Sequence, residues 1–296
     1  MKKVFHPNVS IVIATYNNSK VLTKTLNGIL MLNYPNKYEI LVVNDGSTDD
    51  TKKVLKENFS SNKKIKIFNL PRSGVCKARN TGIKNSKYSI VINMDHDCIP
   101  EKNWLKNMVK GFDSPEIGIV NAYGGFGGTS TAFRKEALKE VGGYDENYFY
   151  YREDTDLTFK ILEKGYKMKK VQAKFFHDHE IEKPKNVFEF LKHVYGRMRN
   201  HMNDPLLYKK HPNKLTKDFL DIKLGFLINP IKDFQAATGT WKKKGKFELS
   251  SPRGIVFLKN KSIFHTLVIF LLGIAYVFSV KTFRLFGSIK HGKLLI

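Results

Sequence analysis

The segment VSIVIATYNN, residues 9–18, decides the fold of this chain. Its apolar, largely β-branched part, Val9–Ala14, predicts a short strand buried on both faces, as in a parallel sheet. The polar residues that follow at once, Thr15, Tyr16 and Asn17, predict a loop at the carboxyl end of that strand.

Four similar apolar runs follow along the chain. They predict further buried strands at Glu39–Val43, Lys64–Phe68, Ser89–Ile92 and Ile117–Asn121. Leu22, Leu26, Ile29 and Leu30 recur at helical spacing, and the acids after Ser47 predict that a helix spans Thr48–Asn58. Strands separated by helices predict an α/β fold with a mainly parallel sheet flanked by helices.

Ligands of such sheets bind at the carboxyl ends of the strands. The second strand ends in Asn44-Asp45-Gly46-Ser47, where a carboxylate suits a hydrogen bond to a base or a ribose hydroxyl. Gly46 predicts an unusual backbone conformation or a close approach of another segment. Asp-Gly-Ser is also a common turn, so this stretch alone leaves both interpretations open.

The fourth strand ends in Asn93-Met94-Asp95-His96-Asp97. Two acids one residue apart beside a buried strand repel each other unless a cation or hydrogen bonds compensate. Hard oxygen ligands suit Mg²⁺ or Mn²⁺, which bridges substrate phosphates. The alternative is an exposed acidic turn.

Two later stretches carry further candidate residues. Glu153, Asp154 and Asp156 open a helical pattern, where they either complement the helix dipole or include a general base. His177 and His179 follow a strand-like run, and His177 is either a metal ligand or a structural residue.

The charge is unevenly distributed. The formal net charge is +24, and 22 of the 51 Lys and Arg residues but only 7 of the 27 acids lie between Glu182 and Ile296. This basic part predicts a surface for nucleic acid, a surface for anionic lipid headgroups, or merely a solvated face. The apolar segment that follows favours lipid.

That apolar segment, Ile263–Val280, has no charged residue over 18 positions and reaches the lower limit for a membrane-spanning helix. A buried core helix and a re-entrant or surface-lying segment are the alternatives, but membrane contact is favoured. The stretch NVFEFLKHVYGRMRNHM at 186–202 predicts a helix that packs on the domain. Cys76 and Cys98 indicate no disulfide framework, and the N-terminus shows no secretory signal pattern.

Taken in order, these motifs resemble glycosyltransferase family 2, the inverting transferases with the GT-A fold. The matching pieces are VSIVIATYNN (9–18), ILVVNDGSTDDT (40–51), GVCKARNTGI (74–83), INMDHDCIP (92–100), GTSTAFRKEAL (128–138), VGGYDE (141–146) and EDTDL (153–157). The resemblance implies a Rossmann-like GT-A catalytic domain over residues 1–180. A basic helical extension (181–262) and a hydrophobic, membrane-associated segment with a basic tail (263–296) would follow.

The resemblance also implies roles for individual residues. Donor-binding residues would be Thr15, Tyr16, Asn17, Asp45, Arg79, Asp95 and His96, with Arg79 supporting the nucleotide pocket and Asp95 near the ribose. Asp97 and His177 would hold a divalent cation, Mg²⁺ or Mn²⁺, against the diphosphate. Asp154 would be the base that deprotonates the acceptor hydroxyl.

The predicted function is therefore transfer of one sugar, with inversion, from a nucleotide-diphosphate sugar to a lipid-linked or glycan acceptor at the cytoplasmic face of the cell membrane. Polymerisation is disfavoured, because the Gln-x-x-Arg-Trp motif of processive synthases is absent after Asp154. Lys160 stands where many members have Arg, which leaves the acceptor-side contacts open. One rival hypothesis is a metal-dependent nucleotidyltransferase, but in this chain no Gly-rich basic signature follows the first strand. The other is a basic nucleic-acid-binding protein.

Overall fold

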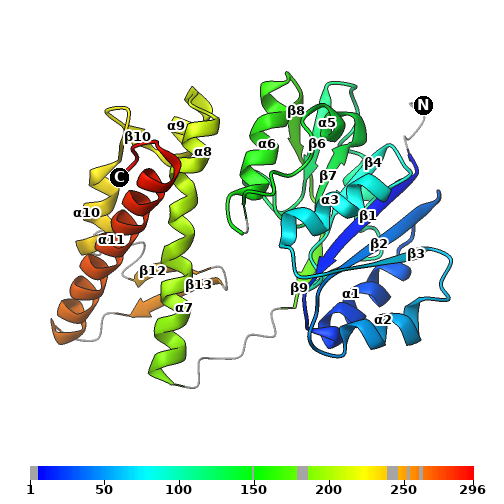
Figure 1. Ribbon diagram of the computed structural model, residues 1–296, viewed down its shortest axis with the longest axis horizontal. Coiled ribbons are helices and arrows are strands. Elements are labelled where there is room, and N and C mark those ends of the chain that lie inside the picture. Colours follow the sequence, from blue (N-terminus) through cyan, green and yellow to red (C-terminus); the bar gives the residue numbers. More distant parts are fainter. Residues whose placement is uncertain (1–5, 149, 179–185, 239–245, 252–253, 260–262) are drawn as a thin grey trace. The chain divides into compact units, whose positions relative to one another are not determined.

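The computed structural model describes residues 6–148, 150–178, 186–238, 246–251, 254–259 and 263–296 (Figure 1). The chain divides into two compact units, Met1–Glu180 and Ile181–Ile296. Each unit is described by itself.

The first unit is built on a seven-stranded sheet with the order β3-β2-β1-β4-β7-β6-β8. Only β7 runs antiparallel to its neighbours, so the sheet is mainly parallel as predicted. Its strands are β1 (Val9–Thr15), β2 (Tyr38–Asp45), β3 (Ile65–Leu70), β4 (Ile90–Asn93), β6 (Ile117–Asn121), β7 (Thr131–Arg134) and β8 (Lys167–Lys170). All five predicted strands are present.

Helices cover both faces of this sheet (Figure 1). They are α1 (Ser19–Leu30), α2 (Thr51–Phe59), α3 (Val75–Asn85), α4 (Trp104–Val109), α5 (Lys135–Glu140) and α6 (Glu153–Glu163). Alternate strand residues such as Ile11 and Ile13 join α1, α2 and α4 in the main core. On the opposite face, Val12 packs against Gly82 of α3, where a side chain would collide with it.

Several details differ from the sequence-based expectations, which did not include the sheet strands β7 and β8. Helix α2 begins at Thr51 rather than Thr48, because Asp49 folds back to accept a hydrogen bond from the Thr51 amide at 3.0 Å and Asp50 accepts one from the Ser19 hydroxyl. A short antiparallel ribbon, β5 (Cys98–Pro100) with β9 (Phe175–His177), was not predicted. It pairs Cys98 with His177 and so brings the end of the first unit beside the Asp95–Asp97 loop.

The second unit is mainly helical. It contains α7 (Val187–Arg199), the 3₁₀ helix η1 (Asn200–Asn203), α8 (Asp204–Lys210), α9 (Lys214–Leu220), α10 (Pro230–Thr238) and α11 (Ile263–His291), with the hairpins β10 (Ile222–Lys223)–β11 (Leu227–Ile228) and β12 (Lys246–Ser251)–β13 (Gly254–Lys259). The predicted helix at 186–202 is present as α7 and η1. Within α11, Phe270–His291 is long and apolar enough to cross a membrane.

Candidate active site

Three loops meet at the carboxyl ends of β1, β2 and β3. The amide of Asn17 donates to the Ser47 hydroxyl at 2.8 Å, and Asn17 Oδ1 accepts from the Thr48 amide at 2.8 Å. Gly46 has φ +69°, and a Cβ there would lie 2.5 Å from the Arg72 amide nitrogen. The prediction of a close approach at Gly46 is therefore confirmed.

The carboxylate of Asp45 is buried, with 2% of the residue exposed, and it is held by the loop after β3. Its Oδ1 accepts from the Ser73 amide at 2.8 Å and from the Ser73 hydroxyl at 2.9 Å, and its Oδ2 accepts from the Gly74 amide at 3.0 Å. Arg72 also pairs with Asp45, and its guanidinium carbon lies 3.7 Å from the centre of the Tyr16 ring. A flat aromatic face, a cation and a carboxylate thus share one corner.

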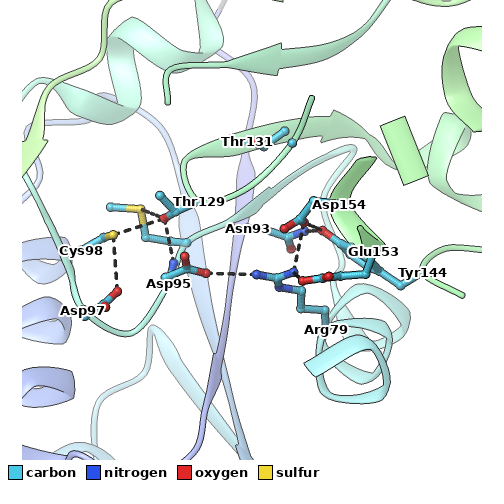
Figure 2. Close-up of polar contacts among 12 residues, drawn as sticks. Arg79, Asn93, Asp95, Asp97, Cys98, Thr129, Thr131, Tyr144, Glu153 and Asp154 are labelled. Atoms are coloured by element: carbon cyan, nitrogen blue, oxygen red, sulfur yellow. Dashed lines mark hydrogen bonds and ion pairs between the residues drawn. The ribbon is translucent and has the colours of Figure 1, made fainter. Parts of the chain in front are cut away.

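Four potential ligand groups gather where β4 ends and the β5–β9 ribbon begins. One ligand atom from each of Asp95, Asp97, Cys98 and His177 lies within 4.8 Å of the others. His177 Nε2 lies 3.1 Å from Asp97 Oδ1, and Figure 2 shows Asp95 and Asp97 on the same loop. The Asp95 amide donates to the Thr129 hydroxyl at 3.0 Å, which fixes that loop against the start of β7.

This donor set fits a hard divalent cation. Two carboxylates and one imidazole suit Mg²⁺ or Mn²⁺, and the carboxylates are partly exposed, which leaves room for substrate oxygens. Burial raises the pKa of the Cys98 thiol, so the sulfur stays protonated and is a poor ligand. Burial lowers the pKa of His177, but the hydrogen bond and charge of Asp97 outweigh it and raise the pKa overall.

A second cluster is organised around Arg79 of α3, which is 7% exposed (Figure 2). Its Nη2 lies 3.1 Å from Asp95 Oδ1, and its Nη1 lies 3.0 Å from Asp154 Oδ1 and 3.5 Å from Glu153 Oε1. The Tyr144 hydroxyl donates to the same Asp154 oxygen at 2.9 Å. One buried guanidinium therefore links Asp95 of the candidate cation site to both acids at the start of α6.

The two acids at the start of α6 differ in their surroundings. Glu153 is buried, and burial together with the charge of Asp154 raises its pKa to about 7 against the opposing charge of Arg79. Its Oε2 has no hydrogen-bond partner among the described residues. The side chain of Asp154 is 20% exposed, and both of its contacts described above are to Oδ1. Burial also raises the pKa of Tyr144, so this hydroxyl remains a hydrogen-bond donor.

The glycine-rich loop between β6 and β7, AYGGFGGTS at 122–130, passes against the start of α6. Gly127 has φ +97°, and a Cβ there would lie 2.6 Å from the Cβ of Asp154. Beside this loop, an open groove of about 690 Å³ is lined by Ile99, Pro100, Ala122, Phe175 and Phe176, with Lys170 and Lys174 among its polar residues. Its wall is the β5–β9 ribbon that also carries His177.

The structure thus brings the predicted residues into adjoining groups. Asp95, Asp97 and His177 form one group, Arg79, Asp95 and Asp154 form another, and Thr15, Tyr16, Asn17 and Asp45 lie at neighbouring strand ends. Thr15 is buried, and the half-buried His96 lies between the two acids. The neighbouring His179 lies outside the described residues.

Several contributors were missed from the sequence: Arg72, Ser73, Thr129, Tyr144 and Gly127. The segment Pro71–Gly74 directly follows β3, so the rule applied to the other strand ends would have found Arg72 and Ser73. Tyr144 lies in VGGYDE and carried no signal of its own, because its role depends on contact with a residue ten positions away.

Comparisons with known proteins establish the family and the fold. The profile described as "Glycosyl transferase family 2" matches residues 10–179, more than half of the chain. A structural neighbour is the mannosyltransferase PcManGT from Pyrobaculum calidifontis, solved in complex with GDP-Man and Mn²⁺. It has a TM-score of 0.61 and 18% identity, over 97% of this chain and 87% of that one. At that identity the likeness shows the fold, a GT-A fold.

Two curated relatives resemble parts of the chain. The glycosyltransferase AglE of Haloferax volcanii is 34% identical over 116 residues, 38% of each protein. A poly-beta-1,6-N-acetyl-D-glucosamine synthase of Staphylococcus epidermidis is 28% identical over 198 residues, 54% of this chain and 47% of that protein. The chain spans less than half the length of these relatives, and the family match rests on its first unit: this chain belongs to glycosyltransferase family 2.

Proposed function

We propose that the chain transfers one sugar from a nucleotide-diphosphate sugar to an acceptor hydroxyl, with inversion at the anomeric carbon. The observation that carries the proposal is the bridge from Asp95 through Arg79 to Asp154, which ties the cation site to a carboxylate at the start of α6. A displacement reaction needs those two functions on opposite sides of the reacting carbon.

The donor would lie over the carboxyl ends of β1, β2 and β4. The base would stack near Tyr16 and take hydrogen bonds at the corner formed by Asp45 and Arg72, with Thr15 and Asn17 shaping the loop beneath. Asp97 and His177 would hold Mg²⁺ or Mn²⁺, with Asp95 and His96 beside them. The bound ion would neutralise charge on the departing nucleotide diphosphate. A protein of the same fold, solved in complex with GDP-Man and Mn²⁺, supports a nucleotide-sugar donor and a divalent cation here.

Asp154 would act as the general base. Arg79 and Tyr144 hold Oδ1, so Oδ2 is the oxygen that would receive the acceptor proton. The acceptor oxygen forms a bond to the anomeric carbon while the bond from that carbon to the phosphate oxygen breaks, and its electron pair leaves with the nucleotide diphosphate. A single displacement of this kind inverts the configuration. Glu153 is buried beside Arg79, which supports a positioning role for it.

The first unit would carry the catalysis, and the second would hold the protein at the cytoplasmic face of a membrane. The excess of basic residues after Glu182 and the apolar helix α11 support membrane contact. A lipid-linked acceptor fits that location, and the groove with apolar walls and Lys170 and Lys174 beside His177 could receive it.

The proposal is tested by a donor screen. Full-length protein is incubated with UDP-, GDP- and dTDP-sugars, membranes and Mn²⁺, and nucleotide release is measured. Release with one donor class that depends on added membrane acceptor supports the proposal, and the proton NMR spectrum of the product reports inversion. Formation of a nucleotidyl product with release of pyrophosphate would show a nucleotidyltransferase instead.

A further inference from the structure

Among its described residues, helix α11 is exposed or half-buried from Phe264 to Ser279 and has buried side chains only from Val280 onward. Leu267, Leu271, Ile274, Phe278, Leu285 and Ile289 recur at intervals of three, four or seven residues, and each is exposed by 41% or more. On the opposite face, Val280, Arg284 and Ser288 are buried. A helix with one apolar face toward the outside and one face against protein is typical of a segment that lies in the plane of a membrane.

The charged residues of α11 are tied to neighbouring helices of the same unit. Arg284 Nε lies 3.1 Å from Oδ2 of the fully buried Asp204 on α8, and Lys281 Nζ lies 2.7 Å from Asp233 on α10. Both cations fall inside the stretch that is apolar enough to span a bilayer. A span that included both cations would carry the acids of α8 and α10 into the hydrocarbon. The uncharged stretch Ile263–Val280 ends just before these cations, and it packs closely on α10 at Gly273.

The first half of α11 and the residues after its end also contact this folded unit. In the first half, a Cβ at Gly273 would lie 2.7 Å from the carbonyl oxygens of Ala236 and Ala237 on α10. After its end, Ile296 exchanges backbone hydrogen bonds with Phe226 and Ile228, the latter a residue of β11. One side of the helix therefore packs against protein. If the helix crossed the bilayer, the backbone groups that it contacts on α10 would lie in hydrocarbon.

The outward face of α11 continues onto α7. Tyr195 meets Phe283 edge to face with ring centres 5.4 Å apart, and Phe188, Leu191 and Tyr195 form an exposed stripe on α7. Figure 1 shows α7, α11 and α10 side by side within this unit. Exposed apolar side chains therefore occur on both of these packed helices.

The charge of the unit identifies the kind of surface that this face meets. Between Glu182 and Ile296 there are 22 Lys and Arg residues but only 7 Asp and Glu residues. Four of those acids, Asp204, Asp218, Asp221 and Asp233, form ion pairs with basic residues of the same unit. Negative charge from a partner is therefore favoured beside the apolar stripe, and an anionic lipid leaflet supplies both apolar chains and negative headgroups.

We propose that α11 and α7 form a monotopic membrane module, in which α11 lies along one leaflet of an anionic bilayer and does not cross it. This inference deepens the membrane attachment proposed above and rests on it, but it is independent of the transfer chemistry.

The first test is flotation of full-length protein with vesicles of phosphatidylcholine plus phosphatidylglycerol and with vesicles of phosphatidylcholine alone. Wild type should float with the anionic vesicles, less at high salt. The double variant Leu271→Glu/Phe278→Glu should lower the partition coefficient at least about tenfold. Met31→Glu/Ser61→Glu adds the same charge at exposed sites of the first unit and should leave the coefficient unchanged.

Nucleotide binding by the same preparations separates this inference from the proposed function. The membrane-module proposal is wrong if the protein binds nucleotide but does not float with anionic vesicles. It is also wrong if Leu271→Glu/Phe278→Glu floats like wild type. Salt-sensitive binding to duplex DNA in place of vesicles would assign the charge to nucleic acid and also overturn it.

The second test asks whether α11 crosses the bilayer and does not require the stripe variant to fold. Cysteines are introduced singly at Lys259, before α11, and at Leu294, after it, while Cys76 and Cys98 are buried. Sealed membrane vesicles containing the full chain are treated with an impermeant maleimide. Both positions should label from the same side, whereas labelling from opposite sides shows a spanning helix and overturns the proposal.

Discussion

Arg79 donates from Nη1 to Oδ1 of Asp154 at 3.0 Å, across 75 residues of sequence. The same guanidinium contacts Asp95 through Nη2, so a single buried cation holds two acids of different proposed function. Desolvation of Arg79 is offset by these acids, which keep it charged. The position of Asp154 is therefore set by Arg79 and Tyr144 before any substrate arrives.

Asp154→Asn should leave donor affinity nearly intact and lower kcat, because a general base acts only in the transition state. The loss should be about 10²–10⁴-fold, the usual contribution of general base catalysis. Glu153→Gln should cost far less, since we assign Glu153 a positioning role. Steady-state kinetics and nucleotide titration compare the two variants. Near-normal turnover of Asp154→Asn, or a dead Glu153→Gln enzyme, would contradict the assignment.

Removal of the divalent cation should abolish turnover, because the diphosphate would then depart without charge neutralisation. Asp97→Ala should have the same effect and should remove the Mn²⁺ dependence of nucleotide binding, as measured by calorimetry with and without Mn²⁺. Asp113→Asn, which alters an exposed acid paired with Lys169, is the matched control. Full activity of wild type in excess chelator would count against a metal role for Asp97 and His177.

Glu153 should make stability depend on pH. Its folded pKa of about 7 lies above its ordinary value of 4.5, so the folded state binds more protons than the unfolded state between those pH values. Stability contributed at this site is therefore present at low pH and is lost as pH rises toward 7. Glu153→Gln mimics the neutral acid. As the pH rises from 5 to 8, its free energy of unfolding should therefore increase by about 1–3 kcal/mol relative to that of wild type.

Urea denaturation at both pH values measures this difference. Glu163→Gln, at the other end of α6 and exposed, controls for the loss of a negative charge from the same helix. If Glu153→Gln and wild type keep the same difference in unfolding free energy at pH 5 and pH 8, the pKa of Glu153 is not raised in the folded protein.

Local patterns predicted five of the seven sheet strands, because these contain apolar runs such as Val9–Ala14 and Ile90–Ile92. Strands β7 (TAFR) and β8 (KMKK) contain no such run and were not predicted. The predicted strands fixed where polar side chains would gather, so Asp45, Asp95 and Asp97 were found without a structure. The start of α2 was misplaced because the Asp49 side chain competes with the helix for the Thr51 amide. That competition depends on loop geometry that periodicity does not encode.

Contacts between distant segments were the part that the sequence could not supply. His177 reaches Asp97 because β9 pairs with β5. The strand-like run before His177 did not show which segment it would pair with, and β5 is only three residues long. The Arg79 bridge joins α3, the loop after β4 and the start of α6. The ion pairs of Arg284 and Lys281 likewise show which side of α11 contacts protein, whereas its composition alone left a spanning, a re-entrant, a surface-lying and a buried helix as alternatives.

Gly127→Ala should damage catalysis through Asp154. The added Cβ would lie 2.6 Å from the Asp154 Cβ and 2.8 Å from its carbonyl oxygen, so the loop or the start of α6 must move. A displacement of about 1 Å in a catalytic group can cost about 10²-fold in rate. Gly125→Ala is the matched control, because Gly125 also has a positive φ, +66°, but has no atom within 4 Å of an added Cβ.

Both alanine variants carry backbone strain, of roughly 1–2 kcal/mol for a left-handed residue, so both should melt at lower temperature than wild type. Only Gly127→Ala should also show a fall in kcat that its loss of stability does not explain, and its affinity for the donor should be retained. Measuring kcat well below each melting temperature separates the two effects. Equal kcat losses in the two variants would show that this loop acts on activity through general destabilisation, and that the contact between Gly127 and Asp154 does not position the base.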